Sequence, residues 1–144
     1  MSDTIPLAQP DRPKRYIGQS VQRPNARRLV AGRGTYTDDI VLPRMVHVAF
    51  VRSPYAHAKI KAIDTGDAQS VPSLVRIIDG AELVATCGPW RGVLSHVQGL
   101  KSAPQHALAV DRVCYQGEPV VAVVAASRAA AEDAASAVAV DYEE

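Results

Sequence analysis

Six apolar stretches of strand length follow one another between residues 45 and 142. They are residues 45–51, 58–63, 74–78, 113–115, 120–126 and 138–142. Residues 45–51 are apolar at odd and at even positions alike, so both faces of a strand there would be apolar. This pattern indicates a central strand that is covered on both faces. Residues 58–63 alternate, so Lys59 and Lys61 should face water. The link between these two stretches, residues 52–57, is short and contains Ser-Pro. It predicts that the two strands pair antiparallel.

Helical signals are fewer. Ser127 is a suitable N-cap for a helix that runs to about Ala137, and its alanine face would let it lie close to a sheet. Single helical turns are expected within residues 25–30, 67–71 and 81–85. Together the pattern predicts an α+β domain in which helices pack on a mixed sheet.

Two segments carry no regular pattern. Residues 86–105 are interrupted by glycine and proline, and loops of this length tend to be functional or to need a partner. Residues 1–17 are rich in proline and basic residues, which predicts an extended arm before a domain of residues 18–144. Gly117 is expected in a tight turn just before the strand of residues 120–126, and a positive φ there would make its replacement by valine destabilising.

Composition limits the class of protein. The chain has 144 residues, of which 47% are hydrophobic and 22% charged. This is ordinary globular usage and excludes wholesale disorder. The longest apolar run, Pro119 to Ala126, suits a buried strand and is too short to span a membrane. The N-terminus offers no apolar segment typical of a secretory signal, so a cytoplasmic protein is expected.

The formal net charge of +1 conceals two opposed ends. Met1 to Gly34 carry a net +5, and Asp111 to Glu144 carry a net −5. A basic end could bind nucleic acid, lie along an acidic neighbour, or keep a tail soluble. Tyr16 is its only aromatic residue, so it lacks a stacking platform for single strands, and no nucleic-acid partner is expected.

No histidine completes a metal site by its spacing. His47, His57, His96 and His106 form no His-x-x-x-His pair, and no acidic or cysteine neighbour completes a ligand set. His47 fits better as a core or interface residue. Ser53 with His57 could suggest a nucleophile and its base, but no strand–elbow–helix context surrounds Ser53. A turn stabilised by a hydrogen bond explains that segment better.

The remaining chemical signals are weak. Gly32-Arg33-Gly34 resembles the start of a phosphate loop, but no Gly-Lys-Ser/Thr follows, and a turn explains it. Asp38-Asp39 could bind a hard cation, although adjacent acids more often cap a turn. Cys87 and Cys114 lie too far apart for a redox or zinc motif, and a disulfide stays open. Cys87 has only Arg91 as a cationic neighbour, so an inert thiol is favoured. We therefore expect no catalytic, cofactor-binding or metal-binding residue.

Four ordered blocks resemble one enzyme family. The first is Gly32 to Ile40, the second is Arg52 to Ala58, the third includes Gly117-Glu118-Pro119-Val120, and the fourth runs from Ala131 to Glu143. They are similar to the large, molybdenum-binding subunit of molybdenum hydroxylases: xanthine dehydrogenase, aldehyde oxidase and aerobic carbon monoxide dehydrogenase. The segment Gly88 to Leu94 looks nearest to the carbon monoxide dehydrogenase branch.

The resemblance implies an α/β-hammerhead fold, the N-terminal domain of that subunit. It implies an oxidoreductase complex in which a molybdopterin cofactor hydroxylates a carbon centre with oxygen from water. Electrons would leave through [2Fe-2S] clusters and FAD on other subunits. The family's pterin-binding loops, catalytic glutamate and copper-binding cysteine loop have no counterpart here, so this chain is expected to bind no cofactor and to be inactive alone.

Two expectations follow for the role of the chain. It could be a scaffold and subunit-contact piece of the molybdenum subunit, with the rest of that subunit and the iron–sulfur and flavin subunits as partners. An exposed apolar surface should then mark the docking site. Alternatively, it could be a stand-alone binding module with the same fold, which predicts a closed, polar surface.

Overall fold

The structure, a computed structural model, describes residues 17, 18, 20, 22–92, 94 and 96–144. The chain divides into two compact units, Met1–Val41 and Leu42–Glu144. All of the expected arm except its last residue lies outside the described residues, so its boundary at residue 17 stays a prediction.

The first unit contains a short helix, α1 (Ala26–Val30), and a 3-10 turn, η1 (Thr37–Asp39). Gly32 follows α1 with a φ of 68°, and its N–H donates to the carbonyl of Leu29 at 3.1 Å. The next N–H, that of Arg33, donates to the carbonyl of Arg28 at 3.0 Å. These two bonds form a Schellman helix end, which is where glycine is favoured. The Gly-x-Gly pair therefore begins as a helix stop, in agreement with the expected turn.

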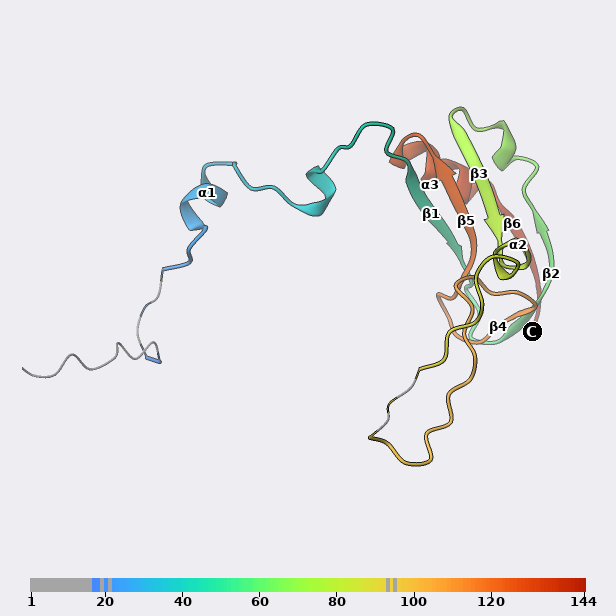
Figure 1. The fold of residues 1–144 in the computed structure, drawn as a ribbon. Coiled ribbons are helices and arrows are strands. Elements are labelled where there is room, and N and C mark those ends of the chain that lie inside the picture. Colours follow the sequence, from blue (N-terminus) through green and yellow to red (C-terminus); the bar gives the residue numbers. More distant parts are fainter. Residues whose placement is uncertain (1–16, 19, 21, 93, 95) are drawn as a thin grey trace, which may run out of the picture. The chain divides into compact units, whose positions relative to one another are not determined.

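Two three-stranded antiparallel sheets build the second unit (Figure 1). The first sheet has the order β1 (His47–Arg52), β5 (Pro119–Ala125) and β3 (Leu74–Asp79). The second has the order β4 (Arg112–Val113), β2 (Ala58–Asp64) and β6 (Ala139–Glu143). The strands agree closely with the predicted stretches, but they form these two sheets and not one mixed sheet.

The predicted pairing of the first two strands is wrong. β1 pairs with β5, and β2 pairs with β4 and β6, so the link after Arg52 carries the chain from one sheet to the other. The predicted central position of β1 is also wrong, because β1 is an edge strand and alternate side chains along it are exposed. β5 is the central strand, and its side chains are almost all buried. Lys59 and Lys61 on β2 are exposed, as expected.

Three short helical elements complete the unit. The helix α3 (Arg128–Ser136) begins after Ser127, whose hydroxyl accepts a hydrogen bond from the N–H of Ala130 at 3.2 Å. It contacts β1 and β5 and so covers one face of the first sheet (Figure 1). The helix α2 (Gly80–Val84) is capped by Asp79, and η2 (Ala68–Ser70) follows β2. The predicted cap and all three short turns are confirmed.

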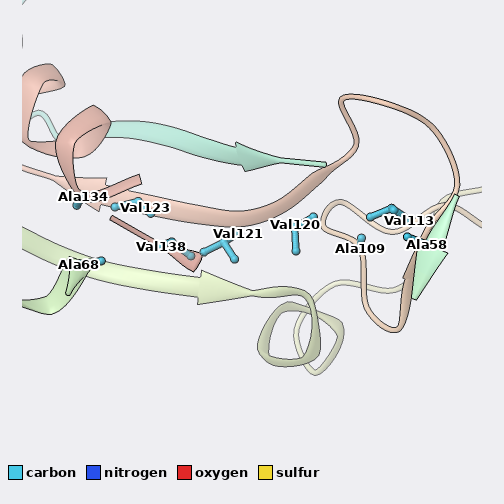
Figure 2. Packing of buried hydrophobic residues seen from close by; sticks show 9 residues of the cluster. All are labelled: Ala58, Ala68, Ala109, Val113, Val120, Val121, Val123, Ala134 and Val138. Atoms are coloured by element: carbon cyan, nitrogen blue, oxygen red, sulfur yellow. The ribbon is translucent and has the colours of Figure 1, made fainter. Parts of the chain in front are cut away.

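Small aliphatic side chains fill the core of this unit, as Figure 2 shows. Its fully buried members are mainly valines and alanines from β5, α3 and the ends of the second sheet. They are Ala58, Ala68, Ala109, Val113, Val120, Val121, Val123, Ala134 and Val138. The alanines of α3 let the helix approach β5 closely, because each lacks a bulky side chain. A core of this kind needs few aromatic residues, in agreement with an aromatic content of 5%.

Candidate functional site

The four histidines are not assembled into a site. His47 is half-buried at the start of β1, and His57 is exposed in the link between β1 and β2. His96 and His106 are exposed in the long segment after α2. Among the residues that the structure describes, no three His, Cys, Asp or Glu side chains form a group able to hold a metal ion.

Ser53 is a structural residue. It is only 3% exposed, and its hydroxyl donates to the carbonyl of Tyr55 and accepts from the N–H of Tyr55, both at 3.0 Å. Its own N–H donates to the carbonyl of Glu118 at 2.9 Å, and its carbonyl accepts from the N–H of Gly117 at 2.8 Å. The hydroxyl thus forms the turn that the sequence predicts and is not presented as a nucleophile beside His57.

The hydroxyl of Tyr142 is buried, and no pattern in the sequence pointed to this residue. It lies on β6, its ring meets the edge of Tyr55 with centroids 5.2 Å apart, and its Oη is buried without a formed hydrogen bond to the described residues. Burial raises the pKa of Tyr142, the nearby Ser53 hydroxyl opposes this change, and Tyr55 adds to it. Strand alternation could have placed Tyr142 inward, but not beside Ser53, which is distant in sequence.

Both cysteines are free thiols at the surface. Cys114 lines a cleft of about 320 Å³ together with His106, Arg112 and Glu118. The Glu118 carboxylate accepts a hydrogen bond from the backbone N–H of Cys114. Arg112 Nε donates to Asp111 Oδ2 at 3.0 Å, and this bond holds the pKa of Asp111 below its ordinary value. Two polar side chains at this cleft, Arg112 and Asp111, thus bind each other, and a third, Glu118, binds the backbone of Cys114.

Asp38 and Asp39 lie in η1 of the first unit. Asp39 Oδ2 accepts a hydrogen bond from the N–H of Tyr36 at 2.9 Å and so caps the 3-10 turn. The capping interpretation of the acidic pair is confirmed at this residue.

Between α2 and β4, the described residues 86–92, 94 and 96–107 form a segment that extends away from both sheets (Figure 1). Its base is closed by paired backbone hydrogen bonds between Trp90 and Gln105, both 2.8 Å long. Large apolar side chains are exposed along it: Trp90 at 65% and Leu94 at 53%, followed by Val97 and Leu100. A shallow groove of about 470 Å³ lies between its two limbs. We call this segment the extended loop.

The face of the first sheet opposite α3 is also apolar and exposed. Val48 and Phe50 on β1 point to this side and are 51% and 46% exposed. Their register partners on β5 are Val124 and Ala122. We call this surface, with its neighbours on β3, the outer face. Sequence reasoning predicted that residues 45–51 would be covered on both sides, and so missed it.

Comparison with known proteins identifies the family. Residues 31–144 match the family described as aldehyde oxidase and xanthine dehydrogenase, a/b hammerhead domain. The chain therefore belongs to this family, and its two antiparallel sheets with few helices are the hammerhead domain. The resemblance and the fold class that the sequence predicted are confirmed.

The relatives are much longer oxidoreductase subunits. The chain is 41% identical over 130 residues to the nicotine 6-hydroxylase large subunit of Paenarthrobacter nicotinovorans, covering 90% of this chain and 16% of the relative. It is 34% identical over 142 residues to the carbon monoxide dehydrogenase large chain of Afipia carboxidovorans, covering 97% and 17%. Quinoline 2-oxidoreductase from Pseudomonas putida 86 superposes with a TM-score of 0.79 at 43% identity, covering 92% of this chain and 17% of that one.

Proposed function

We propose that this chain is a scaffold and subunit-contact domain of a molybdenum hydroxylase, and that the chemistry takes place in other parts of the enzyme. The observation that carries this proposal is the extended loop. Four large apolar side chains along it are open to water. Single exposed apolar residues are ordinary on the surface of a monomer, but several that adjoin one another mark a contact site. A stand-alone binding module with a closed, polar surface does not account for them.

The cysteine content of the chain supports binding of the cofactors by other parts of the enzyme. A plant-type [2Fe-2S] cluster needs four thiolates, and the chain has two cysteines. The residues present therefore do not fit that cluster, and none is assigned here to molybdopterin or FAD. We infer that these cofactors of the complex are held by the rest of the molybdenum subunit and by iron–sulfur and flavin subunits. The chain alone should be inactive, and its cytoplasmic location stays a prediction.

The relatives also suggest a substrate class for the whole enzyme. The segment Gly88 to Leu94 favours the carbon monoxide dehydrogenase branch. The identities of 41% and 43% to proteins named for nicotine and quinoline exceed those of 34% and 36% to carbon monoxide dehydrogenases. We therefore propose hydroxylation of an aromatic nitrogen heterocycle. Turnover of quinoline or nicotine by the complete enzyme with a dye acceptor tests this substrate class. Turnover of carbon monoxide, with no turnover of either heterocycle, would instead support the carbon monoxide dehydrogenase branch.

Affinity purification from the native source tests the contact role. The chain should be recovered with stoichiometric molybdenum, iron and flavin on associated polypeptide. A double variant in the extended loop, Leu94→Asp with Leu100→Asp, should reduce that recovery, because it places charge where an apolar contact is expected. The matched control is His96→Asp with Gln98→Asp, which adds two carboxylates at exposed positions of the same loop outside the groove.

Each outcome has a definite meaning. Recovery without any molybdenum-containing partner would overturn the proposal and favour the stand-alone module. Equal recovery of both double variants would show that the extended loop is not a contact surface.

A further inference from the structure

The outer face of the first sheet is only partly covered in the second unit: Ala122 on β5 is buried, whereas the β1 side of the face is open. Helix α3 packs on the other side, where Ala134 meets the buried valines of β5. A sheet with an apolar face buries that face against another layer of structure. Here Val48 and Phe50 remain about half exposed on the side away from α3.

The register shows that these apolar side chains adjoin one another. Val48 lies opposite Val124, and Phe50 lies opposite Ala122. On the far side of β5, Ala122 lies opposite Ile78 of β3. Side chains opposite each other in an antiparallel sheet are within contact distance on the same face. The outer face is therefore one apolar strip across three strands and not a set of scattered exposed residues.

Arginines flank this strip on two strands. Arg52 is two residues after Phe50 on β1, and its guanidinium carbon lies 5.4 Å from the centroid of the Phe50 ring. Its Nη1 donates to the carbonyl of Gly117 at 2.9 Å. Arg76, on β3 opposite Val124, is paired with Glu82. Among the described residues, Arg52 contacts this ring and this carbonyl and forms no ion pair, so its positive charge is available to a carboxylate.

We propose that the outer face is covered by the remainder of the molybdenum subunit, through an apolar surface that carries a carboxylate opposite Arg52. This inference rests on the proposed function. Two observations select this occupant: the charge at the edge of the strip calls for an acidic partner, and the chain spans only 16–17% of its relatives, so most of such a subunit is available to cover it. An apolar strip flanked by two arginines, of which Arg76 is already paired with Glu82, suits a permanent contact within a subunit.

Thiol labelling in the complete enzyme complex tests whether the face is covered. Val48→Cys places a thiol on the β1 side of the strip, and Val84→Cys places one on α2, at a residue of similar exposure, 41%. Alkylation at each position is followed by peptide mass spectrometry. Position 48 should react roughly tenfold or more slowly than position 84 in the native complex, because a buried contact excludes the reagent. Both should react equally after denaturation.

Photo-crosslinking identifies what lies on the face. A photoreactive phenylalanine analogue in place of Phe50 should form an adduct with a later part of the same polypeptide, in a peptide that contains Asp or Glu. An adduct with residues 17–41, with a second copy, or with the iron–sulfur or flavin subunit would overturn the proposal. So would equal alkylation rates at positions 48 and 84.

These failures are separable from failure of the proposed function. If the chain is recovered with a molybdenum-containing partner while position 48 stays reactive, only the assignment of the outer face is wrong. If no such partner is recovered, the proposed function fails first.

Discussion

Gly80, the first residue of α2, lies against the backbone of the segment that precedes β4. A Cβ added at this position would come within 2.0 Å of the carbonyl oxygen of Ala109 and 2.7 Å of its carbonyl carbon. Both are backbone atoms, so no side-chain rotation can relieve the clash. The Ala109 backbone is itself fixed, because its N–H donates to the carbonyl of Pro119 at 2.8 Å. Gly80→Ala should therefore destabilise the fold.

The magnitude follows from what must move. Ordinary contact distance requires a shift of about 1.4 Å between the two backbones. This shift would weaken the Ala109–Pro119 hydrogen bond, worth about 1 kcal/mol, and loosen the burial of Leu108, worth about 1.5–3 kcal/mol in full. The better helix propensity of alanine offsets about 1 kcal/mol of this loss. We expect a net decrease in the free energy of unfolding of at most about 1.5–3 kcal/mol.

Urea denaturation of the chain, followed by far-ultraviolet circular dichroism, measures this change. Circular dichroism is preferred because the single tryptophan, Trp90, is exposed in the extended loop and reports poorly on the core. The control is Gly88→Ala, since no atom lies within 4 Å of a Cβ at that position and its φ is not in the left-handed region. Gly88→Ala should change stability by less than about 0.5 kcal/mol. Equal stability of the two variants would refute the close approach at Gly80.

Three further substitutions follow from single observations. Gly117 has a φ of 86°, so Gly117→Val should lower the free energy of unfolding by about 1–3 kcal/mol in the same urea assay, and Gly117→Asn should lose less. Ser127→Ala removes the cap of α3 and should cost about 1 kcal/mol, whereas Ser127→Asp should retain most of it. Because folding raises the pKa of Tyr142, its protonated hydroxyl contributes to the free energy of unfolding. This contribution is fully present below the ordinary tyrosine pKa and is lost as pH rises through the raised pKa of the folded state. Tyr142→Phe should therefore reduce alkaline destabilisation in thermal melts between pH 8 and about 11, and unchanged melts would contradict the burial of this hydroxyl.

Local patterns predicted the elements well, but not their partners. The helix of residues 128–136 was found because Ser127 caps it and its alanines recur at helical spacing, both of which are local signals. The link after Arg52 looked like a hairpin because it is short. Strand periodicity carries no information about which strand lies alongside, and here the link crosses between sheets. The bonds of Ser53 to Gly117 and Glu118, which hold this crossing, join residues far apart in sequence.

The error over β1 has a physical origin. Val48 and Phe50 read as core residues because apolar side chains at both parities normally mean cover on both faces. Within residues 42–144, Val48 and Phe50 stay about half exposed on the outer face, although Ala122 between Phe50 and Ile78 is buried. The sequence pattern of β1 is therefore consistent with burial in a larger structure, as the inference on the outer face requires. The expected absence of catalytic residues depends on motif spacing alone and stays a prediction.

The paired crossings of the chain between its two sheets have a consequence for how the domain opens. Among the described strands the chain passes between the two sheets five times, and backbone hydrogen bonds of 2.8 and 2.9 Å join two of these crossings, at Ser53 and at Gly117 and Glu118, directly to each other. These two crossings should therefore open in the same event. Amide protons of Ser53 and Gly117 should then exchange with deuterium at one shared, slow rate, as a marker of whole-domain opening.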